Sequence, residues 1–404
     1  MKAWAEYQLD FLANDTSPQE PIPEWLTLPA LADVPAFHAT VPQYAETPLL
    51  SLSALAKAGG VAGFYVKNEA ERFGLNAFKA LGSSYAISKI LSAALGQNLL
   101  PAGFTGLQQP QTKAKTAAHV FATATDGNHG RGVAWTAKQL GLKAHIYMPA
   151  GTEPERVQAI RDFGAEVTVT DVSYDETVAL ARAQAQQNGW TLVQDTAFPG
   201  YTDIPKLIIQ GYATMAEEIV HRLPPDTPPT HIFLQAGVGS MAGGVLAVLK
   251  QHFPAAHFII IEPKNVACCL KAAAEKNDAA SVGGIQKTIM AGLNCGTPCP
   301  LIMPLLRAHA SFFVGCPDFV AAHGMRLAQN PTQTDPQYIS GESGAVGPGL
   351  ASLLLSDKLP QSRSLLGINS SSVLLAINTE GAMAPAVWHS IVKKGALPLP
   401  KEAN

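Results

Sequence analysis

The chain has 404 residues, with 28 Lys plus Arg against 31 Asp plus Glu, so its formal net charge is −3. Charged residues make up 15% of the chain, against roughly 25% in an average soluble protein, while the apolar fraction of 47% can supply a large core. This composition excludes a disordered chain, and the lack of a basic excess argues against nucleic acid as a partner. The apolar runs are too short to span a bilayer, so no membrane partner is expected.

A strand–loop–helix rhythm runs through the middle of the chain. Strands are predicted at 120–123, 143–148, 166–170 and 191–194, and helices between them at 132–140, 153–163 and 174–188. Gly164 and Gly189, just past the last two helices, are typical stop signals. This βαβαβ order with short connections is typical of a parallel sheet covered by helices.

A second set of elements follows the Pro- and Gly-bearing segment 199–205. The predicted elements are a helix at 206–223, strands at 231–235, 258–261 and 372–378, and a helix opened by a glycine loop after the first of these strands. The polar stretch 102–115 contains Gly and Pro and is expected to be a surface excursion. The fold class is therefore α/β, with two lobes, each a mostly parallel twisted sheet flanked by helices.

The glycine loop at 236–244 (AGVGSMAGG) leaves a strand and enters a helix. Successive backbone N–H groups can turn toward one point there, and the helix N-terminus adds partial positive charge. The loop is therefore suited to bind a phosphate group. A tight strand-to-helix turn without a ligand is the alternative. The loop lacks the Gly-Lys-Ser/Thr of a P-loop and the G-x-G-x-x-G spacing, which disfavours nucleotide hydrolysis and dinucleotide binding.

Two further segments carry candidate chemistry. Lys79 lies in an apolar setting at a predicted helix start, where burial and the helix-end potential both favour the nucleophilic neutral amine. An exposed lysine on an amphipathic helix is the alternative. In the turn at 124–132 (ATDGNHGRG), Asn128 could cap the next helix or bond an incoming ring oxygen, and Asp126 places a carboxylate at the strand end. His129 is expected to be structural.

Together and in this order, the three segments resemble the fold-type II pyridoxal phosphate enzymes, which include threonine and serine dehydratases and the tryptophan synthase β-subunit. The longer segments FGLNAFKALG, ATDGNHGRG, IMAGLNCG, SGESGAVG and INTEGA resemble, within this group, the diaminopropionate ammonia-lyases. The likeness runs from about Tyr65 to Ala382. It implies a large cofactor-binding domain over 1–80 plus 200–404 and a small domain over 81–199.

The resemblance also implies roles for individual residues. Lys79 would form the internal aldimine with pyridoxal 5′-phosphate, Asn128 would bond the ring oxygen of this cofactor, and Thr379 would meet its pyridine nitrogen. The backbone amides that would hold the phosphate belong to Gly237, Val238, Gly239, Ser240 and Met241. Glu342, in SGESG, could contact the cofactor or the substrate.

Two carboxylates distinguish the chain from ordinary dehydratases, which usually have a serine where this chain has Asp126. The second, Asp195, follows the predicted strand 191–194. Carboxylates attract the protonated β-amine of diaminopropionate, and more strongly in a dry cleft than in water. The predicted activity is that of a lyase, α,β-elimination of D- and L-2,3-diaminopropionate to pyruvate and two ammonia by way of aminoacrylate.

In this scheme Lys79 takes the Cα proton of the L-isomer and Asp126 that of the D-isomer, while Asp195 holds the distal amine. A loop-capping role for Asp195 is the alternative. The rival functions are a serine or threonine dehydratase, a non-catalytic pyridoxal phosphate-binding protein and, last, a dinucleotide-dependent oxidoreductase.

The remaining expectations concern cysteines, location and partners. The five cysteines form no C-x-x-C pair, so no metal site is expected. Reduced thiols are favoured, with a bridge from Cys268 or Cys269 to Cys295 left open. The first residues lack the apolar run typical of a secretory signal, which favours the cytoplasm. The resemblance implies a small amino-acid substrate and a homodimer.

Overall fold

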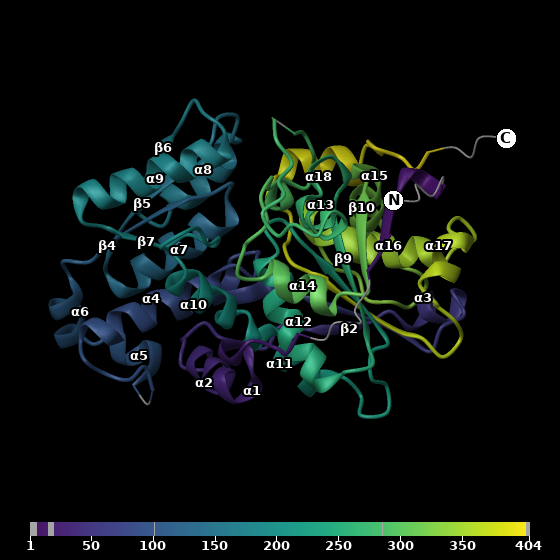
Figure 1. The fold of residues 1–404 in the computed structure, drawn as a ribbon, viewed down its shortest axis with the longest axis horizontal. Coiled ribbons are helices and arrows are strands. Elements are labelled where there is room, and N and C mark those ends of the chain that lie inside the picture. The colour runs from purple at the N-terminus through teal and green to yellow at the C-terminus, as the bar shows by residue number, and fades with distance from the viewer. Residues whose placement is uncertain (1–5, 15–19, 101, 285, 401–404) are drawn as a thin grey trace. The chain divides into compact units, whose positions relative to one another are not determined.

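The computed structural model describes residues 6–14, 20–100, 102–284 and 286–400, so parts of the N-terminal segment considered above lie outside the described residues. The chain divides into two compact units. The larger unit consists of Met1–Pro23, Thr47–Glu71 and Ala216–Asn404, and the smaller unit of Glu24–Glu46 and Arg72–Met215. Figure 1 traces the elements of both units along the chain.

The larger unit contains a seven-stranded sheet in the order β1-β10-β9-β8-β11-β3-β2. Its strands are β1 (Asp10–Ala13), β2 (Leu49–Ser51), β3 (Gly63–Asn68), β8 (His231–Gln235), β9 (His257–Pro263), β10 (Phe312–Cys316) and β11 (Val373–Asn378). The edge strands β1 and β2 pair antiparallel and the inner strands pair parallel. All residues of β8 and β11 are buried, as expected of a parallel sheet covered on both faces.

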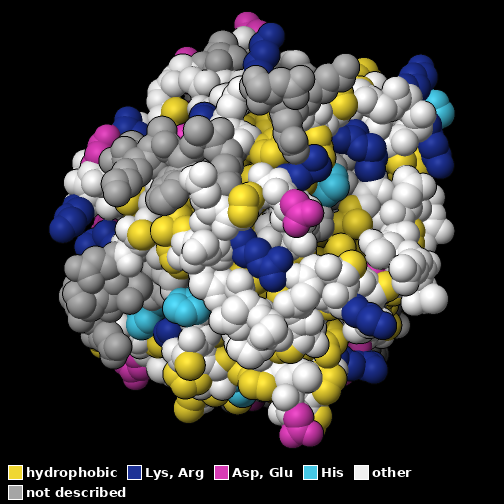
Figure 2. All heavy atoms as spheres, turned by 90° about the vertical axis from the view of Figure 1, so that its right-hand side faces the viewer, with side chains coloured by type: hydrophobic (Ala, Val, Ile, Leu, Met, Phe, Trp, Pro, Cys, Tyr) yellow, Lys and Arg dark blue, Asp and Glu magenta, His cyan; other side chains and the backbone are white. Residues whose placement is uncertain are grey.

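Helices of the larger unit surround this sheet, and α16 packs on β8 and β11. The helices are α3 (Ser53–Ala58), α12 (Ser240–His252), α13 (Cys268–Glu275), α14 (Met303–His309), α15 (Asp318–Gln329), α16 (Glu342–Leu354), α17 (Pro360–Leu365) and α18 (Pro385–Val392). Short 3-10 turns lie at Glu6–Gln8, Glu24–Leu26, Glu69–Gly74, Lys264–Val266 and Ala291–Leu293. In the face shown in Figure 2, charged and hydrophobic side chains are interspersed.

The smaller unit contains a four-stranded, fully parallel sheet in the order β6-β5-β4-β7. Its strands are β4 (Val120–Ala124), β5 (Lys143–Met148), β6 (Glu166–Val169) and β7 (Thr191–Leu192). The helices are α1 (Leu28–Leu31), α2 (Asp33–His38), α4 (Ala80–Ala94), α5 (Gly103–Leu107), α6 (Pro110–Thr116), α7 (Asn128–Leu140), α8 (Pro154–Arg161), α9 (Tyr174–Asn188) and α10 (Asp203–Gly211). The predicted α/β class and the predominance of parallel strands are confirmed in both units.

The two units differ from the predicted domains in where residues 24–46, 72–80 and 200–215 fall. These segments belong to the smaller unit, in which α4 packs against α7 and α10. At Gly82 an added Cβ would lie 2.8 Å from the backbone oxygen of Ile208, so the two helices approach too closely for a larger residue. Which unit binds a cofactor stays a prediction.

Two elements differ from the sequence-based expectation. The stretch predicted as a surface excursion forms α5 and α6, because Phe104 and Leu107 are buried and Pro110 stands in the first turn of α6, where proline is tolerated. The single helix predicted at 206–223 is two helices, α10 and α11 (Ala213–Arg222), interrupted at Tyr212. The Tyr212 ring packs against Phe78, with centroids 5.0 Å apart.

Within the described parts of the chain, every helix is too short or too polar to cross a bilayer.

The contact between α15 and α16 generates a stability prediction. A Cβ added to Gly324 of α15 would overlap the carbonyl oxygen of Ala345 in α16 and lie 3.0 Å from the amide nitrogen of Gly349. We expect Gly324→Ala to lower the free energy of unfolding by about 3 kcal/mol, because backbone cannot yield as a side chain can. Urea unfolding measures the change. Gly283→Ala is the control, since an added Cβ meets nothing within 4 Å there, and equal losses in both variants would contradict the close packing.

Candidate active site

Lys79 lies directly before α4, which begins at Ala80. Its Nζ donates a hydrogen bond to Oδ2 of Asp195 at 2.5 Å, and the Lys79 side chain is 18% exposed. The Phe78 ring centroid is 5.9 Å from Nζ. The structure thus confirms the helix-start position and the apolar setting of this lysine.

The predicted neutral state of the Lys79 amine is wrong for this arrangement. Burial lowers the pKa of Lys79, but the Asp195 carboxylate, with smaller contributions from Tyr212 and Asp126, raises it above the ordinary value. The amine is therefore protonated at neutral pH. The sequence did not indicate this, because Asp195 is 116 positions away.

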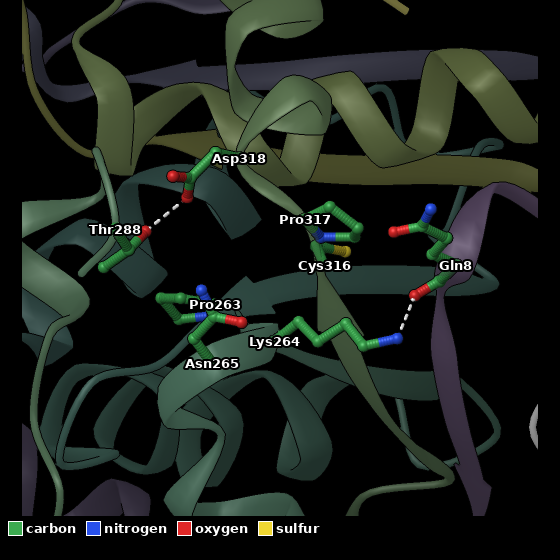
Figure 3. Close-up of a pocket in the computed structure, with 8 residues that line it drawn as sticks. All are labelled: Gln8, Pro263, Lys264, Asn265, Thr288, Cys316, Pro317 and Asp318. Atoms are coloured by element: carbon green, nitrogen blue, oxygen red, sulfur yellow. Dashed lines mark hydrogen bonds between the residues drawn. The ribbon is translucent and has the colours of Figure 1, made fainter. Parts of the chain in front are cut away.

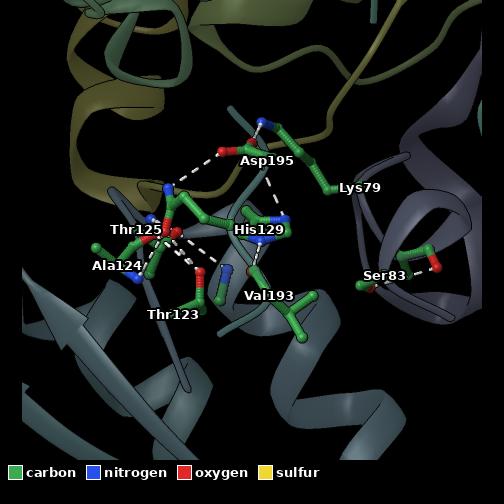
Figure 4. Close-up of polar contacts among 12 residues, drawn as sticks. Lys79, Ser83, Thr123, Ala124, Thr125, His129, Val193 and Asp195 are labelled. Carbon is green, nitrogen blue, oxygen red and sulfur yellow. Dashed lines mark hydrogen bonds and ion pairs between the residues drawn. The ribbon is translucent and has the colours of Figure 1, made fainter. Parts of the chain in front are cut away.

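Asp195 is held by the strand ends of the smaller sheet. The side-chain oxygen of Gln194 accepts bonds from Thr123 Oγ1 and the Ala124 amide, both at 3.0 Å, and its Nε2 donates to Asp195 Oδ1 at 3.4 Å (Figure 4). Burial raises the pKa of Asp195, but Lys79 and His129 lower it to about 2. The carboxylate is thus ionised at neutral pH and fixed beside the amine.

His129 supports this pair from α7. Its Nε2 lies 2.6 Å from the carbonyl oxygen of Val193, and since a carbonyl only accepts, this nitrogen carries the proton. Its Nδ1 lies 4.0 Å from Asp195 Oδ2 (Figure 4). Burial lowers the pKa of His129, although Asp195 opposes the shift, so the ring is neutral at pH 7. These contacts support the predicted structural role.

The turn between β4 and α7 is built by Thr125 and a glycine. Thr125 Oγ1 accepts from the amides of Gly127 and Gly130 at 2.9 and 3.0 Å. Gly127 has φ of 151°, which side chains disfavour, and occupies the N-cap position of α7. Asn128 is the first residue of the helix, so it is not the cap that the sequence left open. Asp126 is half-buried on the same turn.

The glycine loop of the larger unit connects β8 to α12. Gly239 adopts φ of 90° at the N-cap, and α12 begins at Ser240. Gly243 N–H donates to Gly239 O at 2.8 Å, which is the first hydrogen bond of the helix. The Cys299 amide donates to Val238 O at 2.7 Å and fixes the loop. An added Cβ on Gly237 would lie 3.2 Å from Cα of Leu293.

Thr379 directly follows β11, the parallel neighbour of β8. The carboxyl ends of adjacent parallel strands lie at one edge of a sheet, so Thr379 and the glycine loop leave the same edge. Thr379 is 3% exposed, and its Oγ1 accepts a hydrogen bond from Nε2 of Gln235 at 3.1 Å. Glu342 is the buried first residue of α16, and its contact with cofactor or substrate stays a prediction.

The five cysteines carry free thiols. Glu262, Cys268 and Cys269 form a buried cluster whose donor atoms lie within 4.8 Å of one another. Both carboxylate oxygens of Glu262 accept backbone amides at the start of α13, from Cys269 and Leu270 at 2.7 Å. The Cys268 thiol donates to Gly237 O at 3.4 Å. The cluster therefore anchors α13 and the glycine loop, and we assign no metal to it.

A cavity of about 260 Å³ lies at the ends of β9 and β10 in the larger unit (Figure 3). Lys264 on its wall donates to Gln8 O at 2.6 Å and pairs with Asp10 at 3.2 Å. Asp318 on the opposite wall accepts from Thr288 at 2.5 Å. Because these charged groups are engaged by the protein itself, we do not assign a ligand to this cavity.

Comparison with known proteins identifies the family. The family model described as pyridoxal-phosphate dependent enzyme matches residues 41–370. The chain belongs to this family. Diaminopropionate ammonia-lyase of Escherichia coli strain K12 is 47% identical over 365 residues, covering 89% of this chain and 90% of the relative.

Solved structures agree with this assignment to the pyridoxal-phosphate dependent enzymes. The selenomethionine-incorporated holo diaminopropionate ammonia lyase of Escherichia coli is 41% identical and has a TM-score of 0.89, covering 99% of this chain and 100% of that one. The same enzyme in complex with an aminoacrylate–PLP azomethine reaction intermediate is 42% identical with a TM-score of 0.87, covering 97% and 98%. The predicted family and cofactor are thus confirmed.

The glycine loop fits the phosphate of the family's cofactor. Side chains at Gly237 or Gly239 would be tightly crowded, since a Cβ on Gly237 would lie 3.1 Å from Cys295 Sγ and one on Gly239 3.0 Å from Leu306 Cδ1. Backbone amides such as those of the loop are the donors that a phosphate requires. Lys79 offers the amine that an aldehyde requires, so this residue of the smaller unit and the loop of the larger unit each have the chemistry that one part of the cofactor requires.

The sequence missed two residues that hold the candidate site. Gln194 was recognised only as a strand residue, yet its side chain bridges β4 and Asp195. Gln235 was recognised as the end of a strand, yet its amide contacts Thr379. A buried amide at the carboxyl end of a parallel strand was the signal available in both cases.

The Lys79–Asp195 pair predicts a change in amine reactivity. Removing the carboxylate in Asp195→Asn lowers the pKa of Lys79, so the neutral fraction of the amine rises about tenfold for each pKa unit. We expect an amine-reactive acylating reagent to label Lys79 of the cofactor-free variant at least about tenfold faster at neutral pH. Peptide mapping by mass spectrometry quantifies the labelling.

The matched control is Asp126→Asn, since Asp126 raises the Lys79 pKa less than Asp195 does. Because the Lys79 pKa is raised, wild-type labelling should keep rising as pH increases past the ordinary lysine value of 10.5, whereas Asp195→Asn should level off at lower pH. Equal rates in wild type and Asp195→Asn would contradict the ion pair.

Proposed function

We propose that this pyridoxal-phosphate dependent enzyme is a carbon–nitrogen lyase that converts 2,3-diaminopropionate to pyruvate and two molecules of ammonia. The observation that carries the proposal is the ionised, buried Asp195 beside Lys79, in a chain 47% identical to a diaminopropionate ammonia-lyase over nine-tenths of its length. A substrate with a second amine gives this carboxylate a partner that a hydroxyl amino acid lacks.

The residues that would hold the cofactor follow from the likeness to the family and from the chemistry of each group. Lys79 would bind its aldehyde, Asn128 its ring oxygen and Thr379 its ring nitrogen. The amides of Gly237, Val238, Gly239, Ser240 and Met241 would hold its phosphate. Bound pyridoxal phosphate withdraws electrons from the substrate Cα, which eases loss of the Cα proton.

The chain's own groups then handle the protons. When the protonated distal amine of the substrate replaces Lys79 beside Asp195, the Lys79 ammonium loses the carboxylate that stabilises it and can release its proton to water. The neutral Lys79 Nζ then takes the Cα proton of the L-isomer, and the Asp126 carboxylate takes that of the D-isomer. The β-amine, already protonated, leaves as neutral ammonia with the electron pair of the Cβ–N bond, while the electron pair left at Cα forms the Cα–Cβ double bond. The second ammonia is released when water hydrolyses the remaining enamine to pyruvate.

Asp195 has two electrostatic tasks in this proposal. Its carboxylate stabilises the Lys79 ammonium while no substrate is present. Its pKa of about 2 keeps it ionised over the whole neutral range, so it can attract the protonated distal amine of the substrate. Burial makes this attraction stronger than it would be in water.

The small amino-acid substrate, a homodimeric assembly and a cytoplasmic location complete the proposal. The substrate class is supported by the structure of the Escherichia coli relative with an aminoacrylate–PLP azomethine reaction intermediate. The homodimer and the location rest on the likeness to the family and on the sequence.

Substrate comparison tests the proposed activity. We expect kcat/KM for diaminopropionate to exceed that for serine or threonine at least about tenfold. This ratio corresponds to the free energy of one charge-assisted hydrogen bond between Asp195 and the distal amine. A lactate dehydrogenase-coupled assay measures pyruvate from serine and diaminopropionate, and an ammonia assay covers threonine, with both isomers of each.

Asp195→Asn should reduce kcat/KM for diaminopropionate more than for serine, whereas the exposed Asp226→Asn should change neither. Preference for a hydroxyl leaving group would make the chain a dehydratase instead.

The two-base assignment predicts a difference between isomers. Asp126→Asn should reduce kcat for D-diaminopropionate about a thousandfold, as expected for loss of a general base, and that for the L-isomer less than about tenfold. Exchange of the Cα proton with deuterated water, followed by NMR, reports the proton-transfer step itself. Unchanged D-isomer turnover would refute the role of Asp126.

A further inference from the structure

Gln235 is the last residue of β8, and its side chain is 1% exposed. Its Nε2 lies 2.9 Å from the carbonyl oxygen of Ile377 and 3.1 Å from Thr379 Oγ1. The carbonyl oxygens of Ser343 and Gly344 lie further away, at 3.3 and 3.5 Å. The amide nitrogen is therefore surrounded by four oxygens, all within the larger unit.

The orientation of this amide follows from its surroundings. Carbonyl oxygens only accept, so the NH2 group rather than the amide oxygen must face them. The carbonyl oxygen of Gly344 lacks its usual helical hydrogen bond, because the residue four positions on is Pro348, which has no N–H. It therefore needs a donor such as the Gln235 amide. The two protons of Nε2 go to the nearest acceptors, Ile377 O and Thr379 Oγ1.

Donation from Gln235 fixes the direction of the Thr379 hydroxyl. Its oxygen accepts from Nε2, so its single proton must point to another acceptor. Among the described residues, no acceptor for this proton is found. A buried donor left unsatisfied costs about 1–3 kcal/mol, so the proton is available to a bound group.

We propose that Gln235 is a positioning residue that makes Thr379 a hydrogen-bond donor and so selects a cofactor whose ring nitrogen is unprotonated. This inference rests on the proposed function, in which Thr379 meets that nitrogen. A protonated ring nitrogen would bring a second donor to Thr379 Oγ1 and leave the hydroxyl proton without a partner. The chain thus sets the charge of the ring through the amide of Gln235, by way of the Thr379 hydroxyl.

The direct test is the ¹⁵N NMR signal of ring-labelled pyridoxal phosphate bound to the wild-type holoenzyme. We expect the chemical shift of an unprotonated, hydrogen-bonded nitrogen, unchanged as pH is lowered across the range in which the enzyme stays folded. A pyridinium signal at neutral pH would overturn the proposal.

Variants separate positioning from a purely structural role. Gln235→Leu and Thr379→Val should each weaken pyridoxal phosphate binding about tenfold, the loss of one net hydrogen bond. If Gln235 acts through Thr379, the double variant should bind as weakly as Thr379→Val alone. Independent, additive losses would overturn the proposal. The exposed Gln187→Leu is the matched control.

Gln235→Glu provides a second variant for the case that the Gln235→Leu protein does not fold. A buried, protonated carboxyl group has one proton, which goes to the nearer Ile377 O, so Thr379 loses its donor. The ¹⁵N signal should then shift toward the protonated value as pH falls, and a signal like that of wild type would overturn the role of Gln235.

The same sample distinguishes the two levels of inference. Borohydride reduction and peptide mapping show whether Lys79 carries the cofactor. A chain that binds no pyridoxal phosphate through Lys79 would overturn both the proposed function and this inference. Cofactor on Lys79 with a protonated ring nitrogen would overturn the role of Gln235 alone.

Discussion

The buried ion pair between Lys79 and Asp195 is the interaction around which the smaller unit arranges its polar residues. A single charge in this setting would be costly, whereas two opposite charges 2.5 Å apart offset part of each other's desolvation. Gln194 holds the carboxylate side, and the start of α4 holds the lysine. The pair keeps the Lys79 amine protonated for as long as Asp195 is its partner. In the proposed function this ends when the protonated amine of a substrate takes the place of Lys79 beside Asp195, or when an aldehyde reacts with the amine.

In the proposed function the larger unit has a different task, because it would hold a phosphate and a ring with groups that carry no net charge. The glycine loop offers backbone amides, and Thr379 offers a hydroxyl whose direction depends on Gln235. All leave the carboxyl edge of β8 and β11, which is where parallel sheets bring loops together. The proline in α16 adds to the same arrangement, because it leaves a carbonyl next to the Gln235 amide.

Much of the architecture could be predicted because it depends on local patterns. The strand at Lys143–Met148 and the helix at Tyr174–Asn188 agree with the expected bounds, since periodic apolar residues and terminal glycines specify them without distant partners. The stretch 102–115 was misjudged because polar composition concealed two short helices anchored by Phe104 and Leu107. The local pattern at 206–223 predicts one continuous helix. It cannot show the interruption at Tyr212, whose ring packs on Phe78, far away in the sequence.

For the candidate site, the sequence by itself determined which side chains could carry chemistry: a lysine at a helix start, a turn with Asp126 and Asn128, and a glycine loop after a strand. Motif spacing suffices for this, because such loops are built by neighbouring residues. Only the tertiary structure decided the charge of Lys79 and the direction of the Thr379 hydroxyl. Both depend on partners, Asp195 and Gln235, that lie 116 and 144 positions away along the chain, and electrostatic interactions depend on distance in space rather than on sequence separation.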